Sequence, residues 1–247
     1  MEISKVAVIG GGTMGSGIAE VCAKAGIDTI VMEADAGAAE AAQGRILGSM
    51  DKAVARERLS SDDRDAAAGL LAYTTDIEAL SDRDLVIEAI VENEAIKLDL
   101  FRRLDEITPE HAILASNTSS IPLINLGTAT KRPGQVLGLH FFNPATVQKL
   151  CEIVVSIATD DAVLATAKSF AEDTLGKSTI IAQDRAGFIV NRLLVPYLLQ
   201  AISLLDTGQV TREDIDNGMM FGCAHPMGPL TLCDLIGLDT IKSVAPI

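Results

Sequence analysis

Short apolar runs alternate with helix-like segments along most of the chain. The runs predict buried strands at residues 6–9, 28–32, 84–90, 112–115, 135–139, 150–156 and 179–182. Between them, apolar residues recur at intervals of three and four positions in 96–107 and 166–175, which predicts helices. Strands that alternate with helices indicate an α/β fold with a doubly wound parallel sheet. Parallel strands bring their carboxyl ends to one edge, where ligands bind.

A different pattern interrupts this alternation at about residues 36–72, which are alanine-rich and charged. We expect a helical hairpin inserted into the sheet domain. On a helical wheel Arg45, Lys52 and Arg56 fall within about 40° of one another, on a face separate from Ile46 and Met50. One interpretation is a core face opposed to a solvated basic stripe. The other is a stripe that holds a phosphate-bearing substrate tail.

The last part of the chain has only helical patterns. Residues 187–207 form one long helical segment, and a second helix begins after Thr211, a predicted N-cap with Asp214 three residues on. A loop at 225–229 precedes a third helix that starts near Leu230. We therefore expect two domains, a sheet domain over residues 1–184 and a smaller all-α domain over residues 185–247.

The first strand breaks on glycines spaced G-x-G-x-x-G, namely Gly10, Gly12 and Gly15, and a helical pattern begins at once. The first glycine permits a tight turn, the second lets a pyrophosphate approach the backbone, and the third lets helix and strand pack closely. The N–H groups at the start of the helix, around Thr13 and Met14, and the positive end of its dipole favour phosphate. The unit predicts a Rossmann-type dinucleotide site.

Glu33 follows the second strand, 23 residues beyond Gly10. A ribose-binding carboxylate is expected about 20 residues after the glycines. Such a carboxylate accepts hydrogen bonds from ribose hydroxyls and repels a 2′-phosphate, and no Lys or Arg lies between Glu33 and Arg45. We therefore expect NAD as the cofactor rather than NADP.

Composition narrows the classes of partner. A net charge of −14 argues against nucleic acid or an anionic membrane. The uncharged stretch from Leu193 to Leu205 is too short to span a bilayer. The chain enters its first strand without a basic and apolar leader, so we expect a cytoplasmic protein. The cysteines lack metal-ligand spacing and are expected to be reduced core residues rather than a metal site: Cys22, Cys151, Cys223 and Cys233.

His140 and Glu152 are the candidate catalytic pair. His140 follows an apolar strand, and Glu152 interrupts the next one, where a carboxylate is costly unless it has a partner. A carboxylate beside an imidazole fixes the tautomer of the ring and favours its protonated form. That arrangement suits a base that removes a hydroxyl proton while hydride leaves the same carbon. The alternative is a surface histidine and an unrelated strand glutamate.

Several motifs occur in an order that resembles one enzyme family, the L-3-hydroxyacyl-CoA dehydrogenases with their 3-hydroxybutyryl-CoA subgroup. The resemblance covers essentially the whole chain and is carried by residues 10–19, 116–120, 139–144, 149–152, 187–193, 225–229 and 234–240. It implies oxidation of a (3S)-3-hydroxyacyl-CoA to the 3-ketoacyl-CoA by NAD, or the reverse. It also implies a homodimer formed through the helical domain.

The resemblance also implies roles for individual residues. His140 matches the family's general base, Glu152 its carboxylate partner, and Ser119 the serine that binds the substrate oxygen. Asn191 matches an asparagine that reaches in from the helical domain, and Asn143 lines the pocket.

On the cofactor side the resemblance points to Glu33, Glu92, Lys97 and Asn117, with Asn143 beside them. The helical hairpin would hold the CoA nucleotide, which makes Ser49, Lys52 and Arg56 candidate substrate contacts.

The chain departs from the family pattern at two places. Residues 184–186 are Asp-Arg-Ala where a Thr-Pro pair is usual, and the family continues beyond Ile247 with further helices. We therefore expect a shortened helical domain. Two alternatives to the family's reaction remain: a dehydrogenase of a small hydroxy acid without CoA, and a catalytically impaired NAD-binding protein.

Overall fold

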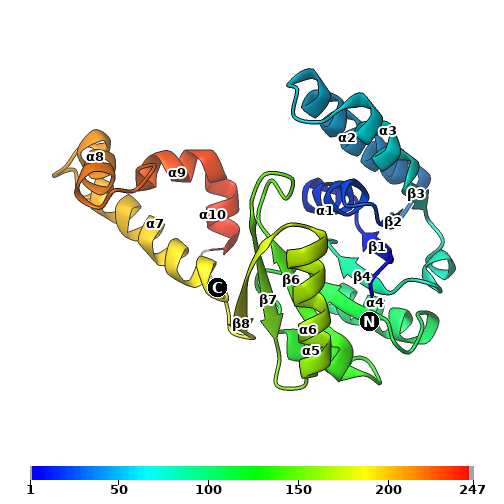
Figure 1. Ribbon diagram of the computed structural model, residues 1–247. Helices are drawn as coiled ribbons and strands as arrows, with labels where there is room; N and C mark the ends of the chain where they lie inside the picture. The colour runs from blue at the N-terminus through cyan, green and yellow to red at the C-terminus, as the bar shows by residue number, and fades with distance from the viewer. Residues whose placement is uncertain (1, 245–247) are drawn as a thin grey trace. The chain divides into compact units, whose positions relative to one another are not determined.

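A computed structural model describes residues 2–244, and the chain divides into two compact units, residues 1–184 and 185–247. The first unit contains an eight-stranded sheet of order β3-β2-β1-β4-β5-β6-β7-β8 (Figure 1). Its strands are β1 Lys5–Ile9, β2 Asp28–Met32, β3 Leu71–Thr74, β4 Leu85–Glu88, β5 Ile113–Ser116, β6 Val136–Phe141, β7 Leu150–Val155 and β8 Ser178–Gln183. The expected doubly wound, Rossmann-type sheet is confirmed.

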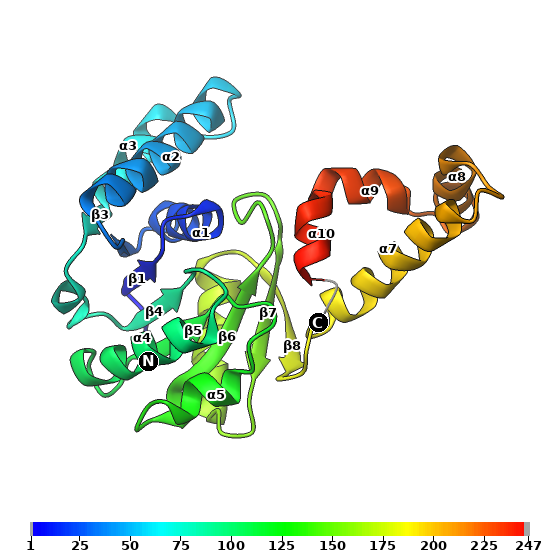
Figure 2. The ribbon, with the colours of Figure 1, turned by 180° about the vertical axis from the view of Figure 1, so that it is seen from behind.

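Helices cover both faces of this sheet (Figures 1 and 2). They are α1 Thr13–Lys24, α2 Ala36–Ala55, α3 Ser61–Gly69, η1 Ile77–Leu80, α4 Glu94–Ile107, α5 Leu123–Thr128, η2 Pro133–Gln135, α6 Asp161–Ser169 and η3 Phe170–Thr174. The predicted hairpin is α2 with α3, which extends past the sheet. Asp35 caps α2 through Ala38 N–H, and Ser60 caps α3 through Asp63 N–H.

The buried side chains form one core on each face of the sheet. Val6 and Val8 of β1 pack with residues of α1 and α2, whereas Ala7 and Ile9 pack with residues of α4. This division follows from the alternation of side chains along a strand. Because both faces are covered, the central strands β1, β4, β5 and β6 are buried along nearly their whole length, which is why they occur as short apolar runs in the sequence.

One strand pair differs from the expected parallel arrangement. β7 runs antiparallel to β6 and parallel to β8, whereas the other neighbouring pairs are parallel. The connection from β6 to β7 spans only residues 142–149, too short for the crossover of a dozen or more residues that parallel neighbours need. The carboxyl ends of β1, β4, β5 and β6 still share one edge, called the carboxyl edge below.

Three local predictions need correction. The sequence pattern did not reveal β3 and α5, which are only four and six residues long, and β3 has no fully buried residue. The helix expected at 166–175 begins earlier, at Asp161. Cys223 is exposed, whereas the other three cysteines are buried; all four are free thiols, and burial raises the pKa of Cys22 and Cys151 to about 12.

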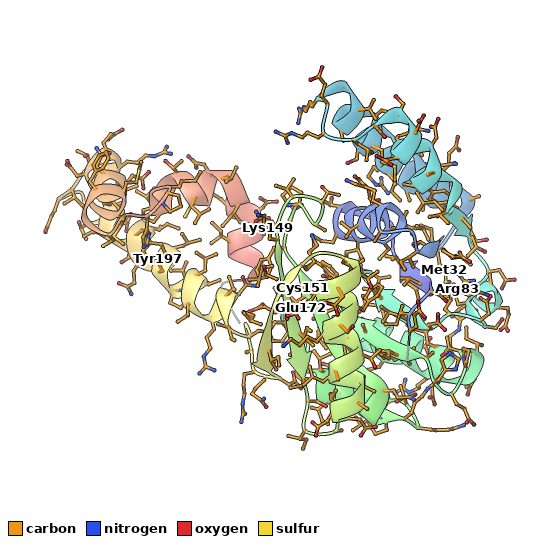
Figure 3. All side chains as sticks on the ribbon, in the orientation of Figure 1. Met32, Arg83, Lys149, Cys151, Glu172 and Tyr197 are labelled. Atoms are coloured by element: carbon orange, nitrogen blue, oxygen red, sulfur yellow. The ribbon has the colours of Figure 1, made fainter. Side chains whose placement is uncertain are left out.

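The second unit contains α7 Val190–Asp206, α8 Arg212–Gly222, α9 Pro229–Ile236 and α10 Leu238–Val244. The predicted Thr211 cap is present, because its Oγ1 accepts a hydrogen bond from Asp214 N–H. Tyr197 lies on α7 (Figure 3), and its hydroxyl is 3.2 Å from Nδ1 of His225. Among the helices that the structure describes, none is long and apolar enough to span a membrane.

Candidate active site

The turn formed by Gly10, Gly11 and Gly12, called the glycine turn, joins β1 to α1. Gly10 has φ +90°, a conformation that favours glycine, and a Cβ on Gly15 would lie 1.7 Å from the carbonyl oxygen of Gly10. Helix and strand can therefore approach this closely only with glycine at position 15. A Cβ on Gly12 would meet nothing within 4 Å, so the turn is open on that side.

Glu33 lies beside this turn, as expected for a ribose-binding carboxylate. Its Oε1 accepts a hydrogen bond from Gly11 N–H at 2.6 Å, and its side chain is half-buried. The first N–H groups of α1 have no partner within the helix, and Gly12 at its N-cap contributes no side chain. An open glycine turn, unpaired helix N–H groups and a nearby carboxylate are the features that fit a dinucleotide with its ribose.

His140 and Glu152 lie directly opposite each other in the antiparallel pair of β6 and β7. Nδ1 of His140 is 2.7 Å from Oε2 of Glu152, and the two residues are only 6% and 0% exposed. His140 lies within β6 rather than after the strand, which corrects the predicted strand end. The ring also contacts that of Phe142 edge to face, with centroids 4.7 Å apart.

This pairing decides the tautomer of the imidazole. An ionised carboxylate only accepts hydrogen bonds, so Nδ1 must carry the proton that it shares with Glu152. Nε2 is then the ring atom able to accept a proton, and the buried carboxylate stabilises the imidazolium that results. The pair can act as a general base at the carboxyl edge.

Residues 117–120, called the serine turn, follow β5 at the same edge. Oδ1 of Asn117 accepts a hydrogen bond from Phe141 N–H at 2.9 Å, which ties the turn to the residue after His140. Glu92, in the loop after β4, accepts hydrogen bonds from the Ser120 hydroxyl at 2.8 Å and from Ser119 N–H at 3.2 Å. Its Oε1 also accepts one from the Thr118 hydroxyl. The predicted Ser119, Asn117 and Glu92 are therefore brought together.

Lys97 lies beneath this turn, with 1% of its side chain exposed. Its Nζ is 2.8 Å from Oε2 of Glu92 and 2.9 Å from Oε1 of Glu88. Glu88 is fully buried and also accepts a hydrogen bond from the Ser116 hydroxyl at 2.6 Å. The sequence analysis missed Glu88, although the signal used for Glu152, a carboxylate inside an apolar run, was present at residues 85–90 as well. The predicted contact of Lys97 with the cofactor stays a prediction.

The ion pairs of Lys97 with Glu88 and Glu92 predict a dependence of the free energy of unfolding on pH, which can be tested at Glu92. Burial raises the pKa of Glu92, but hydrogen bonds from Lys97 and Thr118 outweigh that effect and lower the pKa to about 2. A carboxyl whose pKa is depressed in the folded state stabilises the fold at pH values above its pKa in the unfolded state. That contribution is lost as the pH falls towards the folded-state pKa of about 2. We expect Glu92→Gln to lower the free energy of unfolding at about pH 6, and this difference from the unmutated protein to shrink at about pH 3.5.

Urea titrations at both pH values measure this difference. Glu110→Gln, which removes an exposed carboxyl, is the control for the loss of a charge. A difference that is the same at both pH values would contradict the expectation.

The candidate CoA contacts lie on the hairpin. Ser49 and Lys52 are in α2 and Arg56 is its C-cap; Lys52 and Arg56 are exposed. Arg45, grouped with them on the helical wheel, instead donates to the carbonyl oxygen of Gly11 at 2.6 Å, which corrects the predicted stripe. The long guanidinium side chain reaches the glycine turn because α2 packs beside it.

Two predicted asparagines lie outside these clusters. Asn143 is exposed in the loop between β6 and β7. Asn191 is half-buried near the start of α7, in the second unit. Their roles in binding stay predictions.

The doubly wound sheet, the glycine turn with Glu33, and a buried His–Glu pair at the same edge define a nucleotide-dependent oxidoreductase. Residues 5–185 match the family model described as 3-hydroxyacyl-CoA dehydrogenase, NAD binding domain, and residues 187–247 match its C-terminal domain. The chain belongs to the 3-hydroxyacyl-CoA dehydrogenase family, and its cofactor is NAD.

Individual relatives agree with this assignment. The chain is 50% identical over 244 residues to a 3-hydroxybutyryl-CoA dehydrogenase of Mycobacterium tuberculosis, covering 98% of this chain and 85% of the relative. It is 41% identical to the human mitochondrial hydroxyacyl-coenzyme A dehydrogenase, covering 98% and 79%. The crystal structure of M. tuberculosis FadB2 superposes with a TM-score of 0.97 at 49% identity, covering 100% and 87%. The crystal structure of (S)-3-hydroxybutyryl-CoA dehydrogenase from Ralstonia eutropha superposes with a TM-score of 0.93 at 37% sequence identity, covering 98% of this chain and 86% of the other.

Proposed function

We propose that this protein oxidises a short-chain (3S)-3-hydroxyacyl-CoA, 3-hydroxybutyryl-CoA, to the 3-ketoacyl-CoA with NAD, or catalyses the reverse. The observation that carries the proposal is the His140–Glu152 pair, with 2.7 Å between Nδ1 and Oε2, at the edge of the sheet that also bears the glycine turn. A base at this position is what oxidation of a secondary alcohol needs.

Different residues bind the cofactor and orient the substrate. Gly10, Gly12, Gly15 and the first N–H groups of α1 would hold the pyrophosphate of NAD, and Glu33 would bind its ribose. Bound there, NAD would supply the hydride acceptor. Ser119 and Asn191 orient the substrate hydroxyl by hydrogen bonds.

His140 then accepts the hydroxyl proton at Nε2. Glu152 keeps the ring in the required tautomer and stabilises the imidazolium, since it is buried and bound to Nδ1. In the reverse direction Nε2 returns the proton to the oxygen of the ketone. General base catalysis of this kind contributes about 10²–10⁴-fold, and positioning of the substrate contributes much of the rest.

The CoA end of the substrate is assigned to the hairpin. Lys52 and Arg56 are exposed cations one helical turn apart, with Ser49 on the preceding turn, in a chain of net charge −14. Such a local basic site suits a nucleotide phosphate, and it favours a CoA ester over a small free hydroxy acid.

The oxidation of NADH on addition of acetoacetyl-CoA, followed by nicotinamide absorbance, tests the proposal. We expect turnover with the CoA ester and much less with free acetoacetate. Equal turnover with both would replace the proposal by a dehydrogenase of small acids. NADH binding without any turnover would replace it by an impaired NAD-binding protein.

We further propose that the protein is a cytoplasmic homodimer that pairs through the helical unit. Large apolar side chains are exposed in that unit: Leu193 (71%), Phe221 (80%), Leu235 (70%) and Leu238 (61%). An exposed apolar surface of this kind is typical of a protein interface. Sedimentation equilibrium of the full chain tests this, because a monomer at micromolar concentration would contradict it.

A further inference from the structure

Arg45 is an exposed residue of α2 whose guanidinium binds the backbone of the glycine turn. Its Nη2 and Nε donate to the carbonyl oxygen of Gly11 at 2.6 and 3.0 Å. The Ser16 hydroxyl donates to the same oxygen at 2.6 Å. A carbonyl oxygen has two lone pairs, so these three donors saturate it.

The other polar atom of Gly11 is also held. Its N–H donates to Oε1 of Glu33 at 2.6 Å. A Cβ at this position would lie 2.4 Å from the Cβ of Ala42, so α2 packs directly against the turn. The middle residue of the turn is thus restrained by Glu33, directly after β2, and by residues of α1 and α2.

The hydrogen bonds to the Gly11 carbonyl also restrain Gly12, because the two residues share a peptide unit. The Gly11 carbonyl and the Gly12 N–H belong to one planar trans peptide unit, in which they point in opposite directions. Holding the carbonyl oxygen therefore sets the direction of the Gly12 N–H, at the residue whose Cβ position is open. This N–H is one of the donors that the turn offers to a phosphate.

We propose that Arg45 is a positioning residue for the cofactor: by holding the Gly11 carbonyl, it orients the peptide between Gly11 and Gly12 for the dinucleotide phosphates. This deepens the proposed function and depends on the use of the glycine turn for NAD. Arg45 therefore has a different role from Lys52 and Arg56, which bind the CoA end of the substrate in the proposed function. Arg45 thus affects cofactor affinity, and the other two affect substrate affinity.

Arg45→Gln and Arg45→Lys test the proposal. Titration of NADH by its fluorescence gives the Kd, and steady-state kinetics with acetoacetyl-CoA give both KM values. We expect Arg45→Gln to weaken NADH binding roughly five- to twenty-fold, with kcat at saturating NADH and the KM for acetoacetyl-CoA unchanged. Arg45→Lys should weaken NADH binding less than Arg45→Gln does, because one ammonium nitrogen can give the Gly11 oxygen only one of the two hydrogen bonds that Nε and Nη2 of the guanidinium give it.

Arg103→Gln is the matched control, since Arg103 is exposed on α4 and the substitution removes the same charge. It should change none of these quantities, and thermal melting of each variant checks folding. A rise in the KM for acetoacetyl-CoA alone, or unchanged NADH affinity in Arg45→Gln, would overturn the proposal. Wild-type affinity in Arg45→Lys would show that charge alone acts, which also overturns it. NADH titration needs no turnover, so its outcome is independent of whether the proposed substrate is correct.

Discussion

We expect His140→Gln to lower kcat for the reduction of acetoacetyl-CoA by about 10²–10⁴-fold, the range that general acid–base catalysis contributes, while NADH still binds. The glutamine side chain can donate a hydrogen bond to Glu152, so the buried carboxylate keeps a partner and the fold is retained. It cannot accept and return a proton, which is the function assigned to Nε2.

Steady-state kinetics and NADH titration measure the two quantities. His111→Gln is the matched control, because His111 is exposed and lies away from the carboxyl edge. Its Nε2 is 3.3 Å from Oδ1 of Asp84, the residue directly before the amino end of β4. It should leave kcat unchanged. Wild-type kcat in His140→Gln would remove His140 from the role of base.

Glu152→Gln is the second large effect, with an expected fall in kcat of about 10²-fold or more. The amide carries no charge to stabilise the imidazolium. It can also donate its own N–H to Nδ1, which would leave the proton on Nε2, the tautomer that cannot act as a base. The expected loss is therefore in kcat, with NADH affinity maintained.

Glu172→Gln is the control for this variant. Cys151, the neighbour of Glu152 on β7, and Glu172 on η3 are both labelled in Figure 3. Cys151 packs in the core that η3 covers, whereas the side chain of Glu152 points to the opposite face of the strand. Glu172 accepts a hydrogen bond from the hydroxyl of Thr179, which is not one of the candidate site residues. Equal kcat values for Glu152→Gln and Glu172→Gln would mean that the dyad is misassigned.

The candidate site was predictable where a single segment carries its own physical signal. Gly10, Gly12 and Gly15 have the spacing of a dinucleotide-binding turn, and the apolar run before them and the helical pattern after them give the strand–turn–helix context that this turn needs. Glu152 stands out because a carboxylate in an apolar run needs a partner. Glu88 carries the same signal at the end of β4, and applying the rule consistently would have found it.

Contacts between segments distant in the chain were not predictable in this way. Arg45 on a helical wheel is one cation of a surface stripe, and only the packing of α2 against Gly11 directs it to the glycine turn. Lys97 is similar, because its two carboxylate partners come from the end of β4 and the loop after it. A long flexible side chain can reach several neighbours, so its position along a helix does not determine its partner.

The amino-acid sequence by itself determined the class of fold and pointed to the candidate cofactor site and the candidate catalytic pair, because each depends on local patterns of burial, turn geometry and charge. The tertiary structure alone decided that β7 reverses direction, which sets His140 and Glu152 in register across two strands. It also decided which cation holds the glycine turn. Strand direction and side-chain partners depend on the length of connections and on packing between elements, which no single segment encodes.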